Sequence, residues 1–465
     1  MGFNERIQQA VLLFRERVSH GPVLVVGNLD ADGITATSLI VRALMREHIS
    51  FAVNIIKQIN DSYLDELSSS PYGTIFFVDL GSGYISGIEQ KLTGKHVFIL
   101  DHHYPEKWEV HQSIMHVNPH LDDIDGTKEI SAAGVCYFFA RQLNVQNLDM
   151  AHLALIGAVG DIQENNGFIG LNREILKDAL DNNLIEVKDG LRMYGIYTRP
   201  LSRVLEYSTN PYIPGVTGNR AGALKFIEEH GIARKGKSET IRLNDLNQDD
   251  VDKLLNALHM KVQNNLLGPV YLLRKMNDIP ALRDLREFST LLNACGRMGK
   301  ASLGVGVCLE DKESIAQAFK ILEEYRHEIL QGLEWFYKHR GTECVIEGKG
   351  FTIIRADAEI RDTIIGTLAS LISKSNVYPD NTIIMSMART LGDEIKISMR
   401  ISGFGKSAID LRKIVKEIIN KTGGYGGGHR LAAGATIPQD KEDKLISIAT
   451  ETLSRGVVEE QLINN

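Results

Sequence analysis

The sequence contains only four cysteines, and none of them forms a CxxC or CxxH pattern. Their spacing argues against zinc ribbons and a disulfide framework, and it is typical of a protein from a reducing compartment. No apolar run is long enough to cross a bilayer, and the stretch at the N-terminus mixes charges with apolar residues at helical spacing, unlike a signal peptide. We therefore expect a cytoplasmic protein with no membrane contact.

The chain also lacks an excess of positive charge, because its formal net charge is −7. A polyanionic partner would be repelled by the field of the whole molecule, so it would have to meet a local basic surface or a bound metal. The 465 residues suffice for several domains, each with its own core. Neither a repeat of solenoid period nor a low-complexity tract is evident.

Short apolar runs alternate with helical patterns in the first third of the chain, and several runs end in an acidic residue. The runs are GPVLVVGN (21–28), which Asp30 follows, GTIFFVDLG (73–81) with Asp79, and HVFILDHH (96–103) with Asp101. Runs of this kind, separated by helices, predict a parallel α/β sheet, in which functional groups gather at the carboxyl ends of the strands. The run LALIGAVGDIQ (153–163) is Ala- and Gly-rich, predicts a helix, and also ends near an acid, Asp161.

The rest of the chain changes character twice. Helix periodicity and helix-start signals dominate residues from about 165 to 280, and a long charged helix is predicted over 311–340. An α+β pattern follows it. We predict four parts: a catalytic domain (1–185), a helical insertion (186–282), a segment that ends in a linker helix (283–340), and a C-terminal nucleic-acid-binding domain (341–465).

Acids and imidazoles recur in a fixed order along the first domain: Asp30, Asp32, Asp79, Asp101, His102, His103 and Asp161. Taken singly, each acid is more often a helix cap or a turn residue than a ligand, and Asp32-Gly33 is an ordinary turn signal. Their joint occurrence after apolar runs favours a metal site. Carboxylates with imidazoles suit Mn²⁺ or Mg²⁺ better than zinc, and two such ions about 3.5–4 Å apart form an established arrangement for phosphoester hydrolysis.

The motifs DADG, VD, DHH and GD, followed by GGGHRLAAG near the C-terminus, resemble the DHH phosphoesterase superfamily with its DHH-associated C-terminal domain. LREFSTLLNACGRMG (285–299) is similar to the segment of RecJ-type nucleases that carries an Asn-Ala-x-Gly-Arg signature. Together they resemble the archaeal RecJ-like single-strand exonucleases, also called GINS-associated nucleases. The resemblance implies a parallel-sheet catalytic domain, a helical insertion, a long linker helix and a smaller α+β domain.

Roles for the first domain follow from this resemblance. One metal ion would be held by Asp32, Asp79, His102 and Asp161, and a second by Asp30 and the bridging Asp79. His103 would contact the scissile phosphate, and Asp101 would orient the histidine pair. Asn28 departs from the pattern, because the family usually has Asp or His there. An amide oxygen is a weaker ligand, so one ion would bind loosely or need a high Mn²⁺ concentration.

The resemblance also implies a set of nucleic-acid contacts: Asn293, Arg297, Arg400, Gly426, Gly427, Gly428, His429 and Arg430. Consecutive glycines expose backbone N–H groups to phosphate oxygens, and a helix beginning after them would add its dipole. A glycine cluster alone is a weak signal, and the Asn-Ala-Cys-Gly-Arg run could simply end a helix at Gly296.

These observations predict a two-metal exonuclease acting on single-stranded nucleic acid in DNA replication or repair. The resemblance adds 5′-to-3′ digestion of DNA, RNA as another substrate, and contact with GINS or other replisome proteins. Two alternatives stay open. One is a phosphodiesterase for small substrates or oligoribonucleotides. The other is a non-catalytic scaffold, like the helicase component that keeps this fold.

Overall fold

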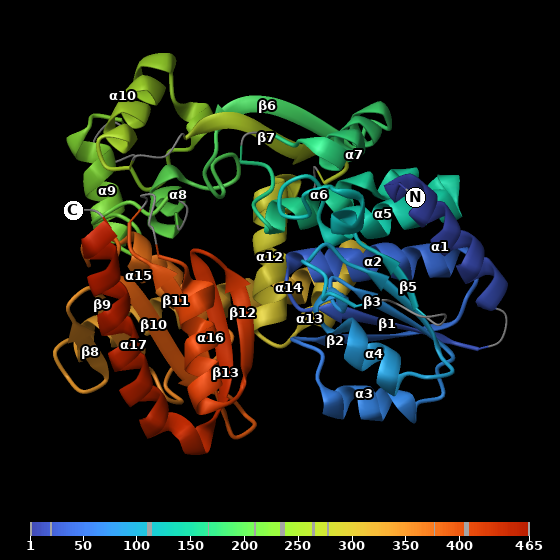
Figure 1. Cartoon of the computed structure of the whole chain (residues 1–465). Coiled ribbons are helices and arrows are strands. Elements are labelled where there is room, and N and C mark those ends of the chain that lie inside the picture. The colour runs from blue at the N-terminus through green and yellow to red at the C-terminus, as the bar shows by residue number, and fades with distance from the viewer. Residues whose placement is uncertain are drawn as a thin grey trace. The chain divides into compact units, whose positions relative to one another are not determined.

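The computed structural model describes residues 2–18, 21–108, 114–165, 167–208, 211–232, 238–262, 266–276, 279–375, 377–403 and 409–463, without the side chains of 429 and 455–463. The contacts within the chain define two compact units (Figure 1). The first unit comprises residues 1–198 and 267–323, and the second comprises residues 199–266 and 324–465.

The first unit contains a parallel five-stranded sheet, as predicted. Its strands follow the order β2 (Phe51–Ile56), β1 (Val23–Asn28), β3 (Thr74–Val78), β4 (His96–Leu100), β5 (Ile114–Val117). The register pairs Val25 with both Val53 and Phe76, and Phe76 with Phe98. The predicted α/β class is therefore confirmed, and the acid-bearing ends of β1, β3 and β4 lie next to one another.

Helices cover both faces of this sheet (Figure 1). On one face, Phe76 and Phe98 stack with ring centroids 4.9 Å apart, and Phe14 of α1 (Phe3–Arg17) and Phe139 of α5 (Ala132–Leu143) pack edge-on against Phe76. On the other face, alternate strand residues pack with α3 (Asp61–Ser68) and α4 (Ile85–Lys91). Side chains alternate between faces along a strand, so continuous apolar runs bury both faces.

The remaining helices of the first unit pack around α2, α6 or α12. They are α2 (Ala31–Arg46), α6 (Ala151–Gly160), α7 (Gly170–Asp181), α11 (Pro280–Arg283), α12 (Leu285–Arg297) and α13 (Ala301–Cys308). The antiparallel ribbon of β6 (Ile185–Leu191) and β7 (Leu267–Leu273) also belongs to this unit. The helical pattern predicted for 186–282 did not include these two strands, which flank the helices α8 (Leu201–Tyr207), α9 (Arg220–Glu229) and α10 (Gln248–His259).

The second unit contains a mixed six-stranded sheet, which confirms the predicted α+β C-terminal part. The strand order is β12 (Tyr425–His429), β13 (Ala432–Pro438), β11 (Glu394–Ile401), β10 (Ile383–Arg389), β9 (Phe351–Arg355), β8 (Val345–Gly348). Apolar residues of the sheet pack against α16 (Leu411–Thr422) and α17 (Glu442–Ile463), and α15 (Ile365–Lys374) contacts β10 and β11. Helix α14 (Lys312–His339) links the two units, and its bounds match the predicted linker helix.

The glycine cluster forms a strand and not a helix entry. Gly426, Gly427 and Gly428 lie in β12 and pair with Ala435, Gly434 and Ala433 of β13. Strand β13, and not a helix, follows them directly, so the expectation of an added helix dipole was wrong. An added Cβ at Gly426 would contact the backbone oxygen of Gly434, which explains a glycine at that position.

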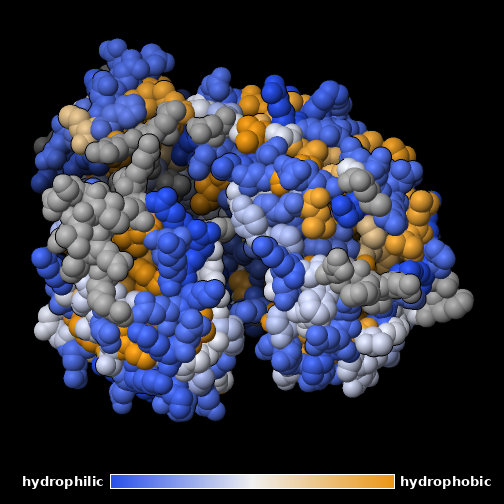
Figure 2. Space-filling view, viewed as in Figure 1, coloured by the Kyte–Doolittle hydropathy of each residue, from blue (hydrophilic) through white to orange (hydrophobic). Residues whose placement is uncertain are grey.

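The surface in Figure 2 is largely hydrophilic, and its apolar side chains lie in small separate patches. Among the described residues, no helix is both long enough and apolar enough to span a membrane.

Candidate metal centre

Asp30 and Asp32 lie at the junction between β1 and α2. Asp30 is the N-cap of α2, and its Oδ1 accepts a hydrogen bond from the backbone N–H of Gly33 at 3.0 Å. The turn is tight, because a Cβ at Gly33 would lie 2.5 Å from the carbonyl oxygen of Asn28. The sequence Asp-Ala-Asp-Gly therefore directs both carboxylates to the carboxyl end of the sheet.

The carboxylate of Asp32 is buried and also binds the start of α5. Its Oδ2 accepts a hydrogen bond from Ala132 N–H at 2.7 Å, and its Oδ1 accepts one from Ala133 N–H at 3.0 Å. Positive partial charge at a helix N-terminus stabilises such an anion. Helix α6 approaches closely at Gly157, where an added Cβ would collide with Asp32 Oδ1.

Asp79 follows β3 in the left-handed region, with φ of 60°. Aspartate tolerates this conformation better than most residues. The residue is 1% exposed, and its side-chain Oδ1 has no hydrogen-bond partner among the described residues. A buried carboxylate oxygen without a partner is costly, and a bound cation would compensate for it.

Asp101 fixes His103. Its Oδ1 accepts hydrogen bonds from His103 Nδ1 at 2.8 Å and from the backbone N–H of His102, while its Oδ2 accepts one from Ser82 N–H at 2.9 Å. Asp101 therefore binds the Nδ1 of His103 and not its Nε2, and the His103 side chain is half exposed. This arrangement leaves one imidazole nitrogen available to a substrate.

His102 is oriented by a backbone carbonyl and not by Asp101. Its Nδ1 donates to the oxygen of Gly126 at 2.6 Å, which leaves Nε2 as the ligand atom. Gln163 Nε2 donates to the same oxygen at 3.0 Å, and Asn172 donates to Gln163 at 2.7 Å. Sequence reasoning missed these supports, because a carbonyl carries no residue signal; only the position of Gln163, two residues after Asp161, could have suggested its role.

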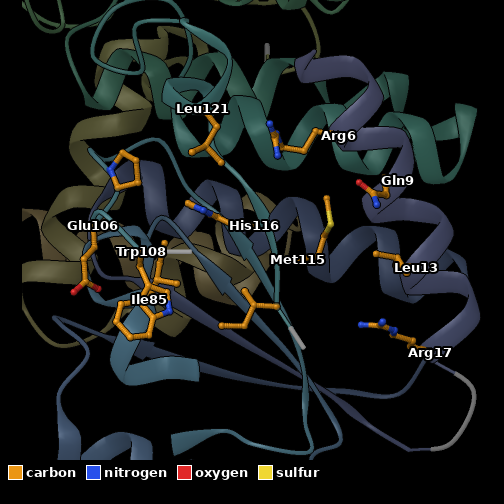
Figure 3. Close-up of a pocket in the computed structure, with 12 residues that line it drawn as sticks. Arg6, Gln9, Leu13, Arg17, Ile85, Glu106, Trp108, Met115, His116 and Leu121 are labelled. Carbon is orange, nitrogen blue, oxygen red and sulfur yellow. The ribbon is translucent and has the colours of Figure 1, made fainter. Parts of the chain in front are cut away.

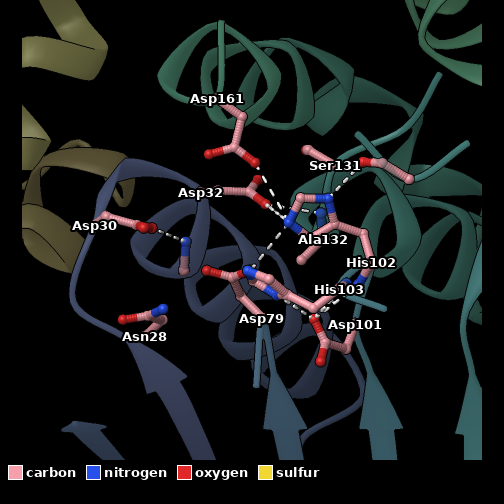
Figure 4. Close-up of polar contacts among 12 residues, drawn as sticks. Asn28, Asp30, Asp32, Asp79, Asp101, His102, His103, Ser131, Ala132 and Asp161 are labelled. Atoms are coloured by element: carbon pink, nitrogen blue, oxygen red, sulfur yellow. Dashed lines mark hydrogen bonds and ion pairs between the residues drawn. The ribbon is translucent and has the colours of Figure 1, made fainter. Parts of the chain in front are cut away.

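Three carboxylates converge on His102 Nε2 (Figure 4). The nearest oxygens lie at 3.3 Å for Asp161, 3.5 Å for Asp79 and 3.8 Å for Asp32. Two sets of residues bring potential ligand atoms within 4.8 Å of one another: Asp79, His102 and His103, and Asp32, His102 and Asp161. Each set supplies oxygen and imidazole donors, the chemistry that Mn²⁺ and Mg²⁺ accept.

Asp30 and Asn28 stand apart from these two sets. Asp30 lies beside the cluster as a helix cap, and the Oδ1 of Asn28 accepts a hydrogen bond from Leu29 N–H at 2.6 Å. In Figure 4 the Asn28 side chain lies below Asp30, and no dashed line joins it to the other residues drawn. Both residues occupy the end of β1, but neither contributes to the two sets of potential ligands.

Burial and mutual repulsion make this cluster costly without a cation. Burial raises the pKa of Asp79 well above its ordinary value, and the charges of Asp30 and Asp32 add to this. Burial and Asp32 raise the pKa of Asp161 to about 8. Burial alone would lower the pKa of His102, but Asp161 and Asp32 outweigh it and raise this pKa to about 9. A divalent cation would take the place of the protons that these groups otherwise retain.

The Asn-Ala-Cys-Gly-Arg run of α12 packs directly on the β1–α2 junction. Asn293 Oδ1 accepts a hydrogen bond from Ala31 N–H at 3.0 Å, and a Cβ at Gly296 would collide with the carbonyl oxygen of Leu29. Arg297 lies in the last turn of α12 and is half-buried. The run therefore supports the turn that carries Asp30 and Asp32. The sequence had suggested either a nucleic-acid contact or a helix end at Gly296, and neither of these included this role.

The other predicted nucleic-acid contacts lie in the second unit. Arg400 of β11 donates to Ser370 Oγ at 2.8 Å and Ser398 Oγ at 3.1 Å, so its guanidinium group is held by hydroxyl groups near α15. Gly426, Gly427 and Gly428 are exposed on the edge strand β12, and Arg430 is exposed just beyond it. The side chain of His429 lies outside the described residues.

Three family models match consecutive parts of the chain. The N-terminal domain of the DHH family matches residues 22–158, the DHH-CID domain matches 193–267, and the DHHA1 domain matches 348–455. An uncharacterised protein of Methanocaldococcus jannaschii is 28% identical over 97% of this chain and 98% of its own length.

Solved structures share the fold. An exonuclease RecJ bound to manganese has a TM-score of 0.59 at 17% identity, over 98% of this chain and 96% of its own. CDC45 of Entamoeba histolytica has a TM-score of 0.65 at 12% identity, over 97% and 99%. The chain spans only 55% of RecJ of Thermus thermophilus in complex with Mn²⁺, while 97% of this chain is covered, with a TM-score of 0.59 at 16% identity.

The first of the three matched domains contains most of the acidic cluster. The DHH match covers β1, β3 and β4 together with Asp32, Asp79 and His102, while Asp161 lies three residues beyond its end. The DHHA1 match covers strands β9 to β13 of the mixed sheet. The chain therefore belongs to the DHH phosphoesterase superfamily and has a RecJ-like fold.

Proposed function

We propose that this protein is a metal-dependent exonuclease that hydrolyses phosphodiester bonds of single-stranded nucleic acid, with DNA digested from 5′ to 3′ and RNA as a second substrate. The convergence of Asp32, Asp79 and Asp161 on His102 Nε2 carries the proposal. The orphaned oxygen of Asp79 and the raised pKa values of the buried carboxylates fit a divalent cation at this place. The likeness to a RecJ exonuclease that binds manganese supports the choice of reaction.

Each side chain has a distinct task in this proposal. Asp32, Asp79, His102 and Asp161 would hold Mn²⁺ or Mg²⁺, and Asp30, beside Asp79, would serve a second ion. The bound ions would supply activation of water and stabilisation of charge on the reacting phosphate. His103, fixed by Asp101 and half exposed, would donate from Nε2 to a phosphate oxygen. Gly126 would keep His102 in the tautomer that presents Nε2.

Manganese should stabilise the protein, and more so at higher pH. In the folded protein the pKa of Asp161 is raised from its ordinary value of 3.8 to about 8. Such a group stabilises the fold most at pH values below 3.8, and this contribution is lost as the pH rises through the folded-state pKa. The metal-free protein should therefore lose stability as the pH approaches 8. Mn²⁺ at about a hundred times its Kd adds about 2.7 kcal/mol, or about 5–10 °C in Tm. The shift should shrink towards pH 6, because protons compete for the ligands.

Differential scanning calorimetry with Mn²⁺ and with EDTA at the two pH values checks this prediction. An identical Tm with and without Mn²⁺ at pH 8 would contradict a metal site in the cluster. Sodium chloride at matched ionic strength controls for general salt effects.

Asn28→Asp should strengthen metal binding. The change places a carboxylate beside Asp30 at the end of β1, where an anionic oxygen binds a hard cation better than an amide oxygen. We expect the Mn²⁺ concentration for half-maximal activity to fall by about tenfold, which corresponds to about 1.4 kcal/mol. Asn28→Ala is the matched control and should leave this concentration unchanged or raise it. A metal titration of the activity that shows no difference between Asp and Ala would exclude position 28 from the site.

Substrate length distinguishes this proposal from a phosphodiesterase for small substrates. In the second unit, the nucleic-acid strand would be held by Arg400, Arg430, the β12 glycines and His429. In the first unit, Asn293 and Arg297 of α12 would contact the sugar-phosphate backbone of the nucleic acid. We expect kcat/KM to rise from dinucleotides to single strands of a few tens of nucleotides, and to be low on blunt duplexes. Highest activity on dinucleotides would favour the small-substrate alternative.

The resemblance to archaeal RecJ-like exonucleases also bears on partners: the helical insertion would contact GINS or another replisome protein.

A further inference from the structure

Tyr104 directly follows the catalytic-loop residue His103, and it is 68% exposed. One face of its ring lies on His120, with centroids 4.1 Å apart and an interplanar angle of 16°. His120 belongs to the short 3₁₀ helix Pro119–Asp122, which follows β5. The result is a flat aromatic pair beside a half-exposed histidine, and the Tyr104 ring is the outer member of the pair.

Asn118 holds the two halves of this pair together. Its side-chain Nδ2 donates to the carbonyl oxygen of His103 at 2.8 Å, and its Oδ1 accepts from the backbone N–H of His120 at 2.9 Å. Nδ2 also donates to Ser82 Oγ at 2.8 Å, and Ser82 N–H donates to Asp101. Asn118 and Ser82 are fully buried. One buried amide therefore fixes the position of the Tyr104–His120 pair relative to His103.

His120 is itself unusual, because its Nε2 is buried and has no hydrogen-bond partner among the described residues. A Cβ at Gly126, whose carbonyl orients His102, would lie 2.9 Å from this Nε2 and would collide with the oxygen of His102. The imidazole of His120 therefore lies near the backbone of His102, the proposed metal ligand, and its ring face supports the ring of Tyr104.

We propose that Tyr104, supported by His120, is a stacking platform for a nucleobase next to the scissile phosphate. Tyr104 is the next residue after His103 and its ring is exposed, so a nucleotide whose phosphate lies at His103 would have a base within reach of this ring. Stacking on an aromatic side chain accepts every base, because each has a π face. The substrate class is therefore a nucleotide chain with bases and not a bare phosphate ester. This inference rests on the proposed function.

Abasic substrates test the platform. Mononucleotide release in Mn²⁺ is measured for wild type, Tyr104→Ala and Tyr104→Trp, on single-stranded DNA with all bases present and on strands that lack the terminal or the second base. We expect Tyr104→Ala to raise KM about tenfold on normal DNA with kcat retained, and Tyr104→Trp to keep the wild-type KM. On the strand that lacks the stacked base, wild type and Tyr104→Ala should have equal KM.

Trp108→Ala is the control for loss of an exposed aromatic from the same segment. Trp108 donates to Glu89 and lines a different pocket, of about 590 Å³, with Arg6 and His116 (Figure 3), so its removal should leave KM unchanged. An equal KM for wild type and Tyr104→Ala on normal DNA would overturn the platform, as would an effect that persists on both abasic strands. Failure of wild type to release any nucleotide would instead overturn the proposed function, and the platform with it.

Discussion

Asp79→Asn is expected to reduce hydrolysis of single-stranded DNA by about a thousandfold, or about 4 kcal/mol of transition-state stabilisation. Its Oδ1 lies 3.5 Å from His102 Nε2 and 3.6 Å from His103 Nδ1, and no described group donates a hydrogen bond to it. An asparagine keeps the shape and the left-handed backbone but removes the charge that a cation needs. Initial rates at saturating Mn²⁺ measure the loss.

The same change should not destabilise the metal-free protein. Burial, Asp30 and Asp32 raise the pKa of Asp79, so the charged form opposes folding at neutral pH and a neutral amide relieves this cost. Asp123→Asn is the matched control, because Asp123 has φ of 59° but is exposed. It should keep full activity. Wild-type activity in Asp79→Asn would contradict the assignment of Asp79 as a metal ligand.

Gly296→Ala is expected to destabilise the first unit by about 3 kcal/mol and to lower its Tm by about 5–10 °C. The added Cβ would collide with the carbonyl oxygen of Leu29, and backbone cannot yield as a flexible side chain can. Helix α12 would have to move away from the turn, and the hydrogen bond from Ala31 N–H to Asn293 would be lost with it. Activity should therefore fall even below the temperature of unfolding, because Asp30 and Asp32 lose their brace.

Thermal unfolding and activity at low temperature measure the two effects separately. Gly73→Ala is the control, because a Cβ there would meet open space and its backbone is not in the left-handed region. It should change Tm by about 1–2 °C at most. If Gly296→Ala behaves like Gly73→Ala, the bracing role of the Asn-Ala-Cys-Gly-Arg run is wrong.

The sequence predicted those parts of the site in which a buried strand delivers a charged residue. The runs before Asp79 and Asp101 are continuous and apolar, so both the strand and the position of its carboxylate followed from local pattern. Strands β2 and β5 were not predicted, because neither run ends in a candidate ligand. Strands β3 and β4 are buried on both faces, which explains their continuous apolar runs, whereas β2 and β5 form the edges of the sheet.

Contacts between distant segments could not be read from pattern. Asn293 and Ala31 are separated by 262 positions, and only the packing of α12 on the β1–α2 turn unites them. The carbonyl of Gly126, which orients His102, belongs to a loop with no distinctive residue. Asn118 precedes a proline and was recognisable as a turn residue, but its hydrogen bonds to His103 and His120 depend on the tertiary fold.

The most direct test of the account is digestion of single-stranded DNA and RNA, labelled at either end, by the purified full chain in Mn²⁺, beside Asp79→Asn and an EDTA-treated sample. The account predicts stepwise release of mononucleotides by wild type, starting from the 5′ end of DNA, and none in either control. An absence of release from every substrate at any Mn²⁺ concentration would contradict it, and the intact fold would then favour a non-catalytic role.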